Sequence, residues 1–306
     1  MIHIFIINSH AGHSKFSAAL RNHLAEKYSH LEYHIFQTRE AGNESKLISE
    51  IIDLFGEEKL RIYCCGGLGT LSNAIRNVEN FDNLEFAYYP KGFANDFLRV
   101  FGSDESKFGK IDNLIDGEVR YIDYIKTNHG NCLNSFSVGL DSEQVIKMTQ
   151  YRDASMFGIA IPYLMAFMYA ILLSRPEELE IIINGEERFT GRFSETFFGN
   201  GGIIGGRIWF DPAPNITDGL GKVAVYKAVN RFNMIRTLID LSQKKMDHKD
   251  RIRFEGFCKS ISLRRRDGTP FVMDFDGEIM KPQREWTATM IQQGFPFVIP
   301  KGVELK

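Results

Sequence analysis

Apolar positions in the first 120 residues follow two alternating patterns. Short apolar runs predict strands, and a run such as IHIFII, apolar at almost every position, indicates burial on both faces of a sheet. The predicted strands are 2–7, 32–38, 60–65 and 84–90. Apolar residues at helical spacing, with a capping start before one segment, predict helices at 15–28, 43–55, 70–78 and 93–102. Strands that alternate with helices predict βαβ units and a parallel sheet.

After about residue 120 the apolar stretches become shorter, and turn signals such as NGE at 184–186 and DGE at 276–278 separate them. This pattern predicts an antiparallel, sandwich-like region that two helical pieces, 141–174 and 231–247, interrupt. We therefore expect an α/β plus all-β fold. Residues 1–124 would form a Rossmann-like domain with a parallel sheet. Residues 125–306 would form an antiparallel β-sandwich-like domain whose last residues pack back on the first.

One stretch, ASMFGIAIPYLMAFMYAILLS at 154–174, carries no charge over a length that could cross a bilayer. Pro162 interrupts it, and Ser155, Gly158 and Tyr163 weaken the pattern. A buried or surface-docking helix pair is the preferred interpretation. A membrane span, or the lining of an apolar groove for a lipid chain, remain alternatives.

Composition narrows the class of protein. With 43% hydrophobic and 25% charged residues, the chain resembles a soluble globular protein, and a net charge of −2 predicts no nucleic-acid partner. None of the four cysteines is in CxxC spacing, so we expect reduced structural thiols. The N-terminus has no basic region before its apolar run, which predicts a first strand and a cytoplasmic protein.

The most suggestive turn is GGLGT at 66–70, between a predicted strand and a predicted helix. Glycines let the backbone approach a ligand closely, and the first turn of a helix offers N–H groups to a phosphate. Thr70 could cap that helix or donate to a phosphate oxygen. The dinucleotide fingerprint is absent, because Ser72 stands where its third glycine would be, and so is the lysine of a P-loop. Alone, the turn fits a structural strand–helix corner equally well.

The order of the motifs along the chain is more specific than any one of them. The stretches are IINSHAGHSK (6–15), QTREAG (37–42), CGGLGTLSN (65–73), YPKGFANDFLR (89–99), RYID (120–123), the glycine-rich 197–223 and FDGE (275–278). Together they resemble the diacylglycerol kinase catalytic-domain family, lipid kinases that include sphingosine-type kinases. The resemblance implies a nucleotide-binding kinase domain related to that of NAD kinase over 1–124 and a lipid-substrate domain over 125–306. It also implies transfer of the γ-phosphate of ATP to a lipid hydroxyl, with Mg²⁺.

The resemblance assigns roles residue by residue. It assigns nucleotide binding to Asn8, Gly12, Lys15, Thr38, Gly66, Gly67, Gly69, Thr70, Asn73, Gly92, Asn95 and Asp123. It assigns the catalytic set to Asp96, Asp276 and Glu278, with Glu278 as the base that takes the proton of the lipid hydroxyl. A structural magnesium site would use Asp218 with the backbone of Asn215 and Leu220.

Each assignment also has a purely structural alternative. Asp276-Gly277 and Asp218-Gly219 are good turn sequences, and Glu278 could be a solvated strand residue. Asp96 could be an ordinary acid in the first turn of a helix. The order of the motifs favours functional descent for the whole set.

The chain departs from the family pattern at the phosphate loop. The family has G-G-D-G-T where this chain has Leu68, and usually P-x-G-T-x-N-D where it has Phe93. The aspartate is expected to organise magnesium and the ATP phosphates, and neither leucine nor phenylalanine can do so. Ser9 also replaces a proline of the first loop.

Three functions therefore stay open. The chain could be an ATP-dependent kinase of diacylglycerol or a related lipid alcohol. Alternatively, it could be a weakened family member that binds nucleotide or lipid without efficient phosphoryl transfer. A kinase of a soluble alcohol is a third possibility. A lipid substrate predicts peripheral contact with the inner face of a membrane, to which the basic clusters at 243–249 and 263–268 could contribute. Pairing of sheet edges could also produce a homodimer.

Overall fold

The structure is a computed structural model. It describes residues 1–8, 14–38, 42–92, 95–140, 142, 146, 147, 169, 175–245 and 250–305. The chain divides into two compact units. Unit 1 comprises Met1–Asp123 and Gln293–Lys306, and unit 2 comprises Tyr124–Gln292.

Unit 1 is built on a parallel sheet, as the alternating pattern predicts. Its strands, in spatial order, are β17 (Glu285–Ile299, of which the part from Gln293 belongs here), β4 (Leu84–Pro90), β3 (Leu60–Gly66), β1 (Ile2–Asn8) and β2 (Tyr33–Thr38). β3 is buried at every position, and β1 and β4 are buried at all but the last. Burial on both faces explains their continuous apolar runs.

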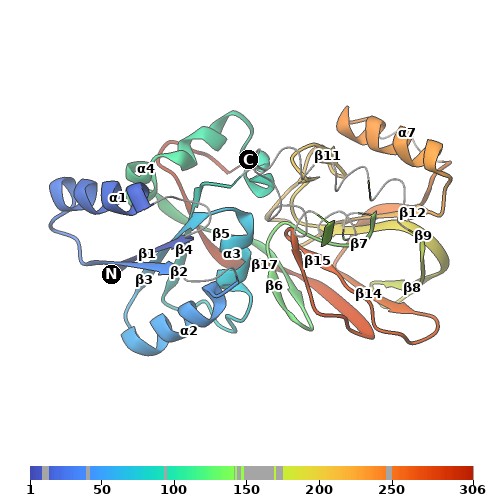
Figure 1. Cartoon of the computed structure of the whole chain (residues 1–306), viewed down its shortest axis with the longest axis horizontal. Helices are drawn as coiled ribbons and strands as arrows, with labels where there is room; N and C mark the ends of the chain where they lie inside the picture. The colour runs from blue at the N-terminus through green and yellow to red at the C-terminus, as the bar shows by residue number, and fades with distance from the viewer. Residues whose placement is uncertain are drawn as a thin grey trace. The chain divides into compact units, whose positions relative to one another are not determined.

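Helical segments cover both faces of this sheet (Figure 1). They are α1 (Ser14–Lys27), α2 (Glu44–Phe55), α3 (Leu68–Ile75), the 3-10 segment η1 (Asp96–Gly109) and α4 (Ile111–Ile115). α2 packs against α3, and side chains of α1 bind Asp112 of α4. Burial alone would raise the pKa of Asp112, but hydrogen bonds from Lys27, His23 and Tyr28 lower it to about 2.

Two local predictions in unit 1 were wrong. The helix predicted at 93–102 is instead part of the 3-10 segment η1, whose two pieces meet at a kink at Gly102, where φ of 57° and ψ of −124° are not helical. Asn43 does not cap α2, because its backbone is already helical, at φ −77° and ψ −3°, and its side chain makes no capping hydrogen bond. A capping residue needs an extended backbone to bring its side chain over the first turn.

Unit 2 is predominantly antiparallel. Its strands are the end of β5 (Glu118–Thr127), β6 (Gly130–Cys132), β7 (Ser135–Gly139), β8 (Glu177–Ile183), β9 (Glu187–Gly199), β10 (Ile203–Ile204), β11 (Ile208–Trp209), β12 (Gly221–Lys227), β13 (Ile252–Cys258), β14 (Ser260–Arg265), β15 (Asp274–Phe275), β16 (Glu278–Ile279) and the first part of β17. β9 pairs with β7, β8 and β12 along its length. The predicted combination of an α/β and an antiparallel β domain is therefore confirmed.

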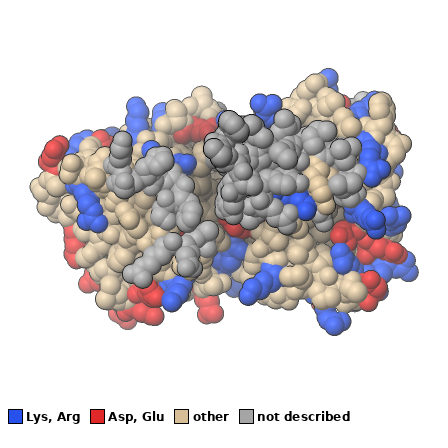
Figure 2. Space-filling model, in the orientation of Figure 1, with Lys and Arg blue, Asp and Glu red and all other residues tan. Residues whose placement is uncertain are grey.

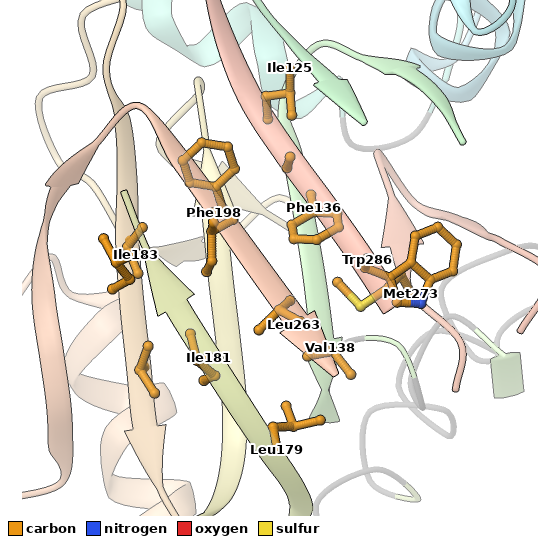
Figure 3. Close-up of a cluster of buried hydrophobic side chains, with 14 of the residues drawn as sticks. Ile125, Phe136, Val138, Leu179, Ile181, Ile183, Phe198, Leu263, Met273 and Trp286 are labelled. Carbon is orange, nitrogen blue, oxygen red and sulfur yellow. The ribbon is translucent and has the colours of Figure 1, made fainter. Parts of the chain in front are cut away.

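A large apolar cluster fills the core of unit 2. Figure 3 shows side chains from β7, β8, β9 and β14 converging on one another, with Phe136, Ile181 and Leu263 among them. Trp286 is fully buried in the same cluster, and its Nε1 donates to the main-chain oxygen of Phe271 at 3.0 Å. The apolar periodicity of these strands is thus explained by one shared core.

The helix α7 (Arg231–Ser242) is shorter than the predicted 231–247. Asn230 caps it by accepting a hydrogen bond from the backbone N–H of Asn233. Among the described helices, none is long and apolar enough to cross a bilayer. The 154–174 segment lies outside the described residues, apart from Tyr169.

Candidate functional site

Several of the predicted nucleotide-binding residues, among them Asn8, Thr38 and Gly66, lie at the carboxyl edge of the parallel sheet of unit 1. In the strand register, Asn8 lies opposite Thr38, and Gly66 lies opposite Pro90. Open parallel sheets bind ligands at this edge, because loops and helix starts meet there. Thr38 is 3% exposed, and its Oγ1 finds no hydrogen-bond partner within the described part of the chain. A buried hydroxyl of this kind needs a ligand or water to satisfy it.

Asn8 links two loops at this edge. Its Nδ2 donates to Oε1 of Glu44 at 3.0 Å and to Oγ1 of Thr70 at 3.0 Å. An amide nitrogen has two hydrogens, so these two bonds engage both. Because the oxygen of Thr70 accepts from Asn8, the hydroxyl hydrogen of Thr70 can point away from it, as donation to a phosphate oxygen would require.

Glu44 is a site residue that the sequence reasoning missed. It is the first residue of α2, it is fully buried, and it lies beside Asn8 rather than in solvent. An ionised carboxylate only accepts hydrogen bonds, so Glu44 fixes which end of the Asn8 amide faces it. A charged residue between the second-strand loop and an apolar helix was the available signal, and it resembled an ordinary first-turn acid.

Glycines shape the phosphate loop by letting backbone segments touch. A Cβ on Gly66 would collide with the Thr70 side chain, and one on Gly92 would lie 2.6 Å from the Cα of Gly67. The backbone N–H of Lys91 donates to the carbonyl of Gly66 at 2.7 Å. The loops that end β3 and β4 are therefore in direct backbone contact, and side chains at these positions would separate them.

α3 begins earlier than predicted, and this changes the role of Thr70. The helix starts at Leu68, with the extended backbone of Gly67 before it, so Thr70 lies inside the first turn and is not the cap. Leu68 is only 8% exposed, and Ser72 is fully buried. The loop at 66–73 thus keeps its backbone geometry but contains no carboxylate.

The fourth loop is held by Asn95, which has a left-handed backbone at φ 48°. Its Oδ1 accepts from the hydroxyl of Tyr88 at 2.7 Å, and its Nδ2 donates to the carbonyl of Gly92 at 3.2 Å. Burial, aided by the negative charge of Asp96, raises the pKa of Tyr88, so this hydroxyl stays protonated and able to donate. Phe93, the second departure, lies outside the described residues, as do Ser9, Gly12 and the side chain of Lys15.

Asp123 lies at the end of the unit 1 segment in β5 and is fully buried. Its Oδ1 accepts from the backbone N–H of Gln293 at 2.7 Å, where β17 enters unit 1. Gln293 has a positive φ of 46°, a conformation that this charged hydrogen bond stabilises. Asp123 thus has a structural task in addition to the nucleotide contact predicted for it.

In unit 2, Asp276 turns out to be a backbone clamp. Its carboxylate accepts from the backbone N–H groups of Leu133 at 2.7 Å, Asn134 at 2.8 Å and Ser135 at 2.8 Å. Asp276 and Gly277 have φ values of 54° and 84°, which form the tight two-residue turn between β15 and β16. This geometry favours a positioning role for Asp276 over direct contact with reacting atoms.

Glu278 follows immediately and is exposed at the start of β16. The clamp on Asp276 fixes the turn, and the turn fixes where the Glu278 carboxylate projects. An accessible carboxylate on a rigid turn is suited to proton transfer, which needs a base held within hydrogen-bond reach of its substrate.

Comparison with known proteins supplies the family. Residues 3–127 match the model of the diacylglycerol kinase catalytic domain, and residues 134–290 match that of the YegS C-terminal NAD kinase beta sandwich-like domain. This chain belongs to the diacylglycerol kinase catalytic-domain family. The predicted resemblance is therefore confirmed. A comparison of this chain with curated proteins found no match.

Solved structures of proteins from Bacillus anthracis str. Sterne have the same fold as this chain. One, a candidate diacylglycerol kinase, superposes with a TM-score of 0.74 at 22% identity, over 99% of this chain and 96% of that one. A second, described as a diacylglycerol kinase, gives a TM-score of 0.69 at 19% identity, over 99% and 98% of the two chains. At these identities the similarity shows the fold.

The family implies magnesium, and the two predicted magnesium regions differ in how well they fit it. In the described part of this kinase-family chain, no three His, Cys, Asp or Glu side chains gather closely enough to bind a metal ion. The phosphate loop does not fit, because Leu68 supplies no oxygen. The exposed Asp218 fits better, because it supplies a carboxylate, one oxygen of which accepts from the backbone N–H of Leu220 at 2.9 Å.

Proposed function

We propose that this chain is an ATP-dependent lipid kinase that phosphorylates diacylglycerol or a related lipid alcohol. The observation that carries the proposal is the hydrogen-bonded bridge from Glu44 through Asn8 to Thr70. It places an oriented hydroxyl at the start of α3, beside backbone that only glycine permits at Gly66 and Gly92. A nucleotide phosphate would accept from Thr70, from the first N–H groups of α3 and from the buried hydroxyl of Thr38.

The proposed reaction needs a base and a phosphate acceptor. The hydroxyl oxygen of the lipid attacks the γ-phosphorus, the bond to the oxygen that bridges the β- and γ-phosphates breaks, and ADP leaves. Glu278 takes the hydroxyl proton as the new bond forms. Asp276 positions Glu278 through the turn and does not itself exchange a proton, because its carboxylate serves three backbone N–H groups.

Magnesium enters the proposal in a limited way. Bound beside Asp218, with carbonyls of Asn215 and Leu220, Mg²⁺ would neutralise the carboxylate and tie the loop together. In unit 1, Asp123 is proposed to lie beside the nucleotide and its metal, and Asp96 is proposed to belong to the catalytic set. No step is assigned to a metal held by the phosphate loop, because Leu68 cannot bind one.

Leu68 also favours a second function. A family member without the loop carboxylate would bind nucleotide or lipid and transfer phosphate slowly, because phosphoryl transfer relies on charge neutralisation at the phosphates. The substitution of Phe93 for the family threonine points the same way. For both functions, a lipid ligand implies peripheral contact with a membrane, which we place at its inner face.

Two measurements on the whole chain separate these functions. The first is titration calorimetry of ATP with and without Mg²⁺, and the second is ADP release with a panel of lipid alcohols. Turnover that depends on a lipid would establish the kinase. ATP binding without lipid-dependent turnover would establish the weakened form. The absence of both in the native chain and in Leu68→Asp would overturn the proposal.

The variant Leu68→Asp tests the assignment of the loop. Restoring a carboxylate at this position should tighten Mg²⁺-dependent ATP binding by about tenfold, or about 1.4 kcal/mol. Adding Phe93→Thr should increase the gain. ATP affinity that both variants leave unchanged would mean that position 68 does not face the nucleotide.

A further inference from the structure

The helix α7 has apolar residues on an inward and an outward face. Leu238 and Leu241 pack inward, in or against a cluster that includes Phe197 and Tyr226, and Met234 packs against Leu140. The outward face carries Phe232, Ile235 and Ile239, which are 75%, 41% and 49% exposed. Packing in unit 2 explains the inner face only.

The outward residues form one continuous stripe. Their spacing of three and then four residues places them on one side of a helix with 3.6 residues per turn. Of the seven large hydrophobic side chains that are exposed in the described part of the chain, three belong to this stripe. A contiguous apolar stripe on an exposed helix marks a binding surface, whereas single exposed apolar residues need no explanation.

Positive charge borders the stripe. At 100° per residue, Arg231 and Arg236 lie on its two sides, and Lys244 and Lys245 follow the helix. The acid on the helix, Asp240, pairs with Arg251 at 2.6 Å. Figure 2 shows the result as uncharged surface with Lys and Arg side chains beside it where α7 lies, at the upper right.

A tryptophan lies beside Lys244, just past the C-terminal end of α7. Trp209 of β11 is partly exposed, and the Nζ of Lys244 lies 3.8 Å from the centroid of its ring. Tryptophan and lysine are the side chains that settle where the headgroups of a bilayer meet its acyl chains, because each combines an apolar body with a polar end.

We propose that the outward face of α7 docks onto an anionic lipid bilayer, with the helix lying in the plane of the interface. Phe232, Ile235 and Ile239 would enter the acyl boundary, while Arg231 and Arg236 bind lipid phosphates on either side. This inference rests on the proposed function only because a lipid substrate lies in a membrane, which the enzyme must contact to reach it. The docking itself needs neither ATP nor turnover.

A second copy of the chain is a poorer occupant of this face. A two-fold interface would bring the same patch of both copies together, so the arginines and lysines that border the stripe would repel their equivalents. Three side chains are also a small apolar area beside the roughly 800 Å² per partner of a stable interface. An anionic bilayer satisfies both the apolar stripe and its positive border.

The test is cosedimentation of the full chain with vesicles, without nucleotide. We expect binding to phosphatidylglycerol–phosphatidylcholine vesicles. Phe232→Ser should reduce the partition coefficient on the order of tenfold, and the triple change with Ile235→Ser and Ile239→Ser further. Leu54→Ser is the matched control, because Leu54 is 69% exposed on α2, a helix of unit 1, and should leave binding unchanged.

A separate pair of substitutions tests the positive charges that border the stripe. Arg231→Gln with Arg236→Gln should lower binding to anionic vesicles on the order of tenfold and should remove most of its salt dependence. Thermal unfolding of each variant verifies that the fold is retained.

Three outcomes would overturn the proposal: equal losses in Phe232→Ser and Leu54→Ser, no vesicle binding by the native chain, or a sedimentation-detected dimer that only the α7 variants dissociate. Because binding is measured without ATP, a chain that docks but has no kinase activity would fail only the proposed function.

Discussion

Unit 2 contains two hairpin turns with nearly the same local sequence and backbone. The 184–186 turn is Asn-Gly-Glu and the 276–278 turn is Asp-Gly-Glu. The φ values of their first two residues are 53° and 75° in one and 54° and 84° in the other. Both turns end in an exposed glutamate. They differ locally only in loop length, because Ile183 pairs with Glu187 across three loop residues, whereas Phe275 pairs with Glu278 across two.

Their surroundings differ. The 184–186 turn joins β8 and β9, which pair over seven register positions, and Asn184 accepts from the backbone N–H groups of Lys259 and Ser260. The 276–278 turn joins strands of two residues each, and the Asp276 carboxylate adds three hydrogen bonds to the 133–135 backbone. A long ladder holds the first turn, whereas one buried side chain holds the second. The conformation of a turn therefore does not reveal whether it carries a functional residue.

The largest expected effect separates the two glutamates. Glu278→Gln should reduce lipid-dependent ADP release by about 10²- to 10⁴-fold, because the amide cannot take a proton. Glu186→Gln, the same change on the other turn, should leave the rate within about twofold. Steady-state rates of both variants make the comparison. Equal rates would remove Glu278 from the proposed reaction.

The next effect concerns stability. Asp276→Ala should lower the free energy of unfolding by about 3 kcal/mol or more, because three N–H groups lose a charged acceptor. Asn184→Ala removes two hydrogen bonds at an exposed turn and should cost about 1 kcal/mol. Urea unfolding measures both. A cost at Asp276 no larger than that at Asn184 would mean that the clamp contributes little.

In unit 1, a matched pair of glycines tests whether the close approach of two loops contributes to stability. Gly92→Ala would place a Cβ 2.6 Å from backbone, whereas Gly67→Ala would make an ordinary contact at 3.6 Å. We expect a loss of about 2 kcal/mol for Gly92→Ala and within about 0.5 kcal/mol for Gly67→Ala. Thermal unfolding of the two variants gives the difference. Equal losses would mean that the close approach of the loops after β3 and β4 does not contribute to stability.

The smallest effect should be the same in both turns of unit 2. At Gly277 and Gly185 the φ values are positive, and an added Cβ would meet nothing within 4 Å. Alanine at either position should therefore cost only backbone strain, about 1 kcal/mol. Urea unfolding of Gly277→Ala and Gly185→Ala checks this equality. A markedly greater loss at Gly277 would show that the short strands beside it cannot absorb strain.

The sequence predicted the architecture well, because the signals for it are local. Apolar runs and helical spacing identified the four parallel strands from β1 to β4 and the helices between them. The order of motifs identified the family. The capping start predicted for the 43–55 helix was wrong, and of the two roles offered for Thr70 the structure excludes the cap, because helix starts depend on backbone angles that propensity does not set.

By itself, then, the sequence determined the α/β and β architecture, the family, and the absence of a carboxylate at Leu68. Only the tertiary structure decided what the polar residues do. Asn8 meets Thr70 across 62 positions, and Asp276 meets Asn134 across 142. Hydrogen bonds between residues so far apart leave no periodic trace in the chain, because periodicity records which face of an element is buried. For that reason Glu44 resembled a first-turn acid, and two similar glycine turns could not be told apart, until the chain was folded.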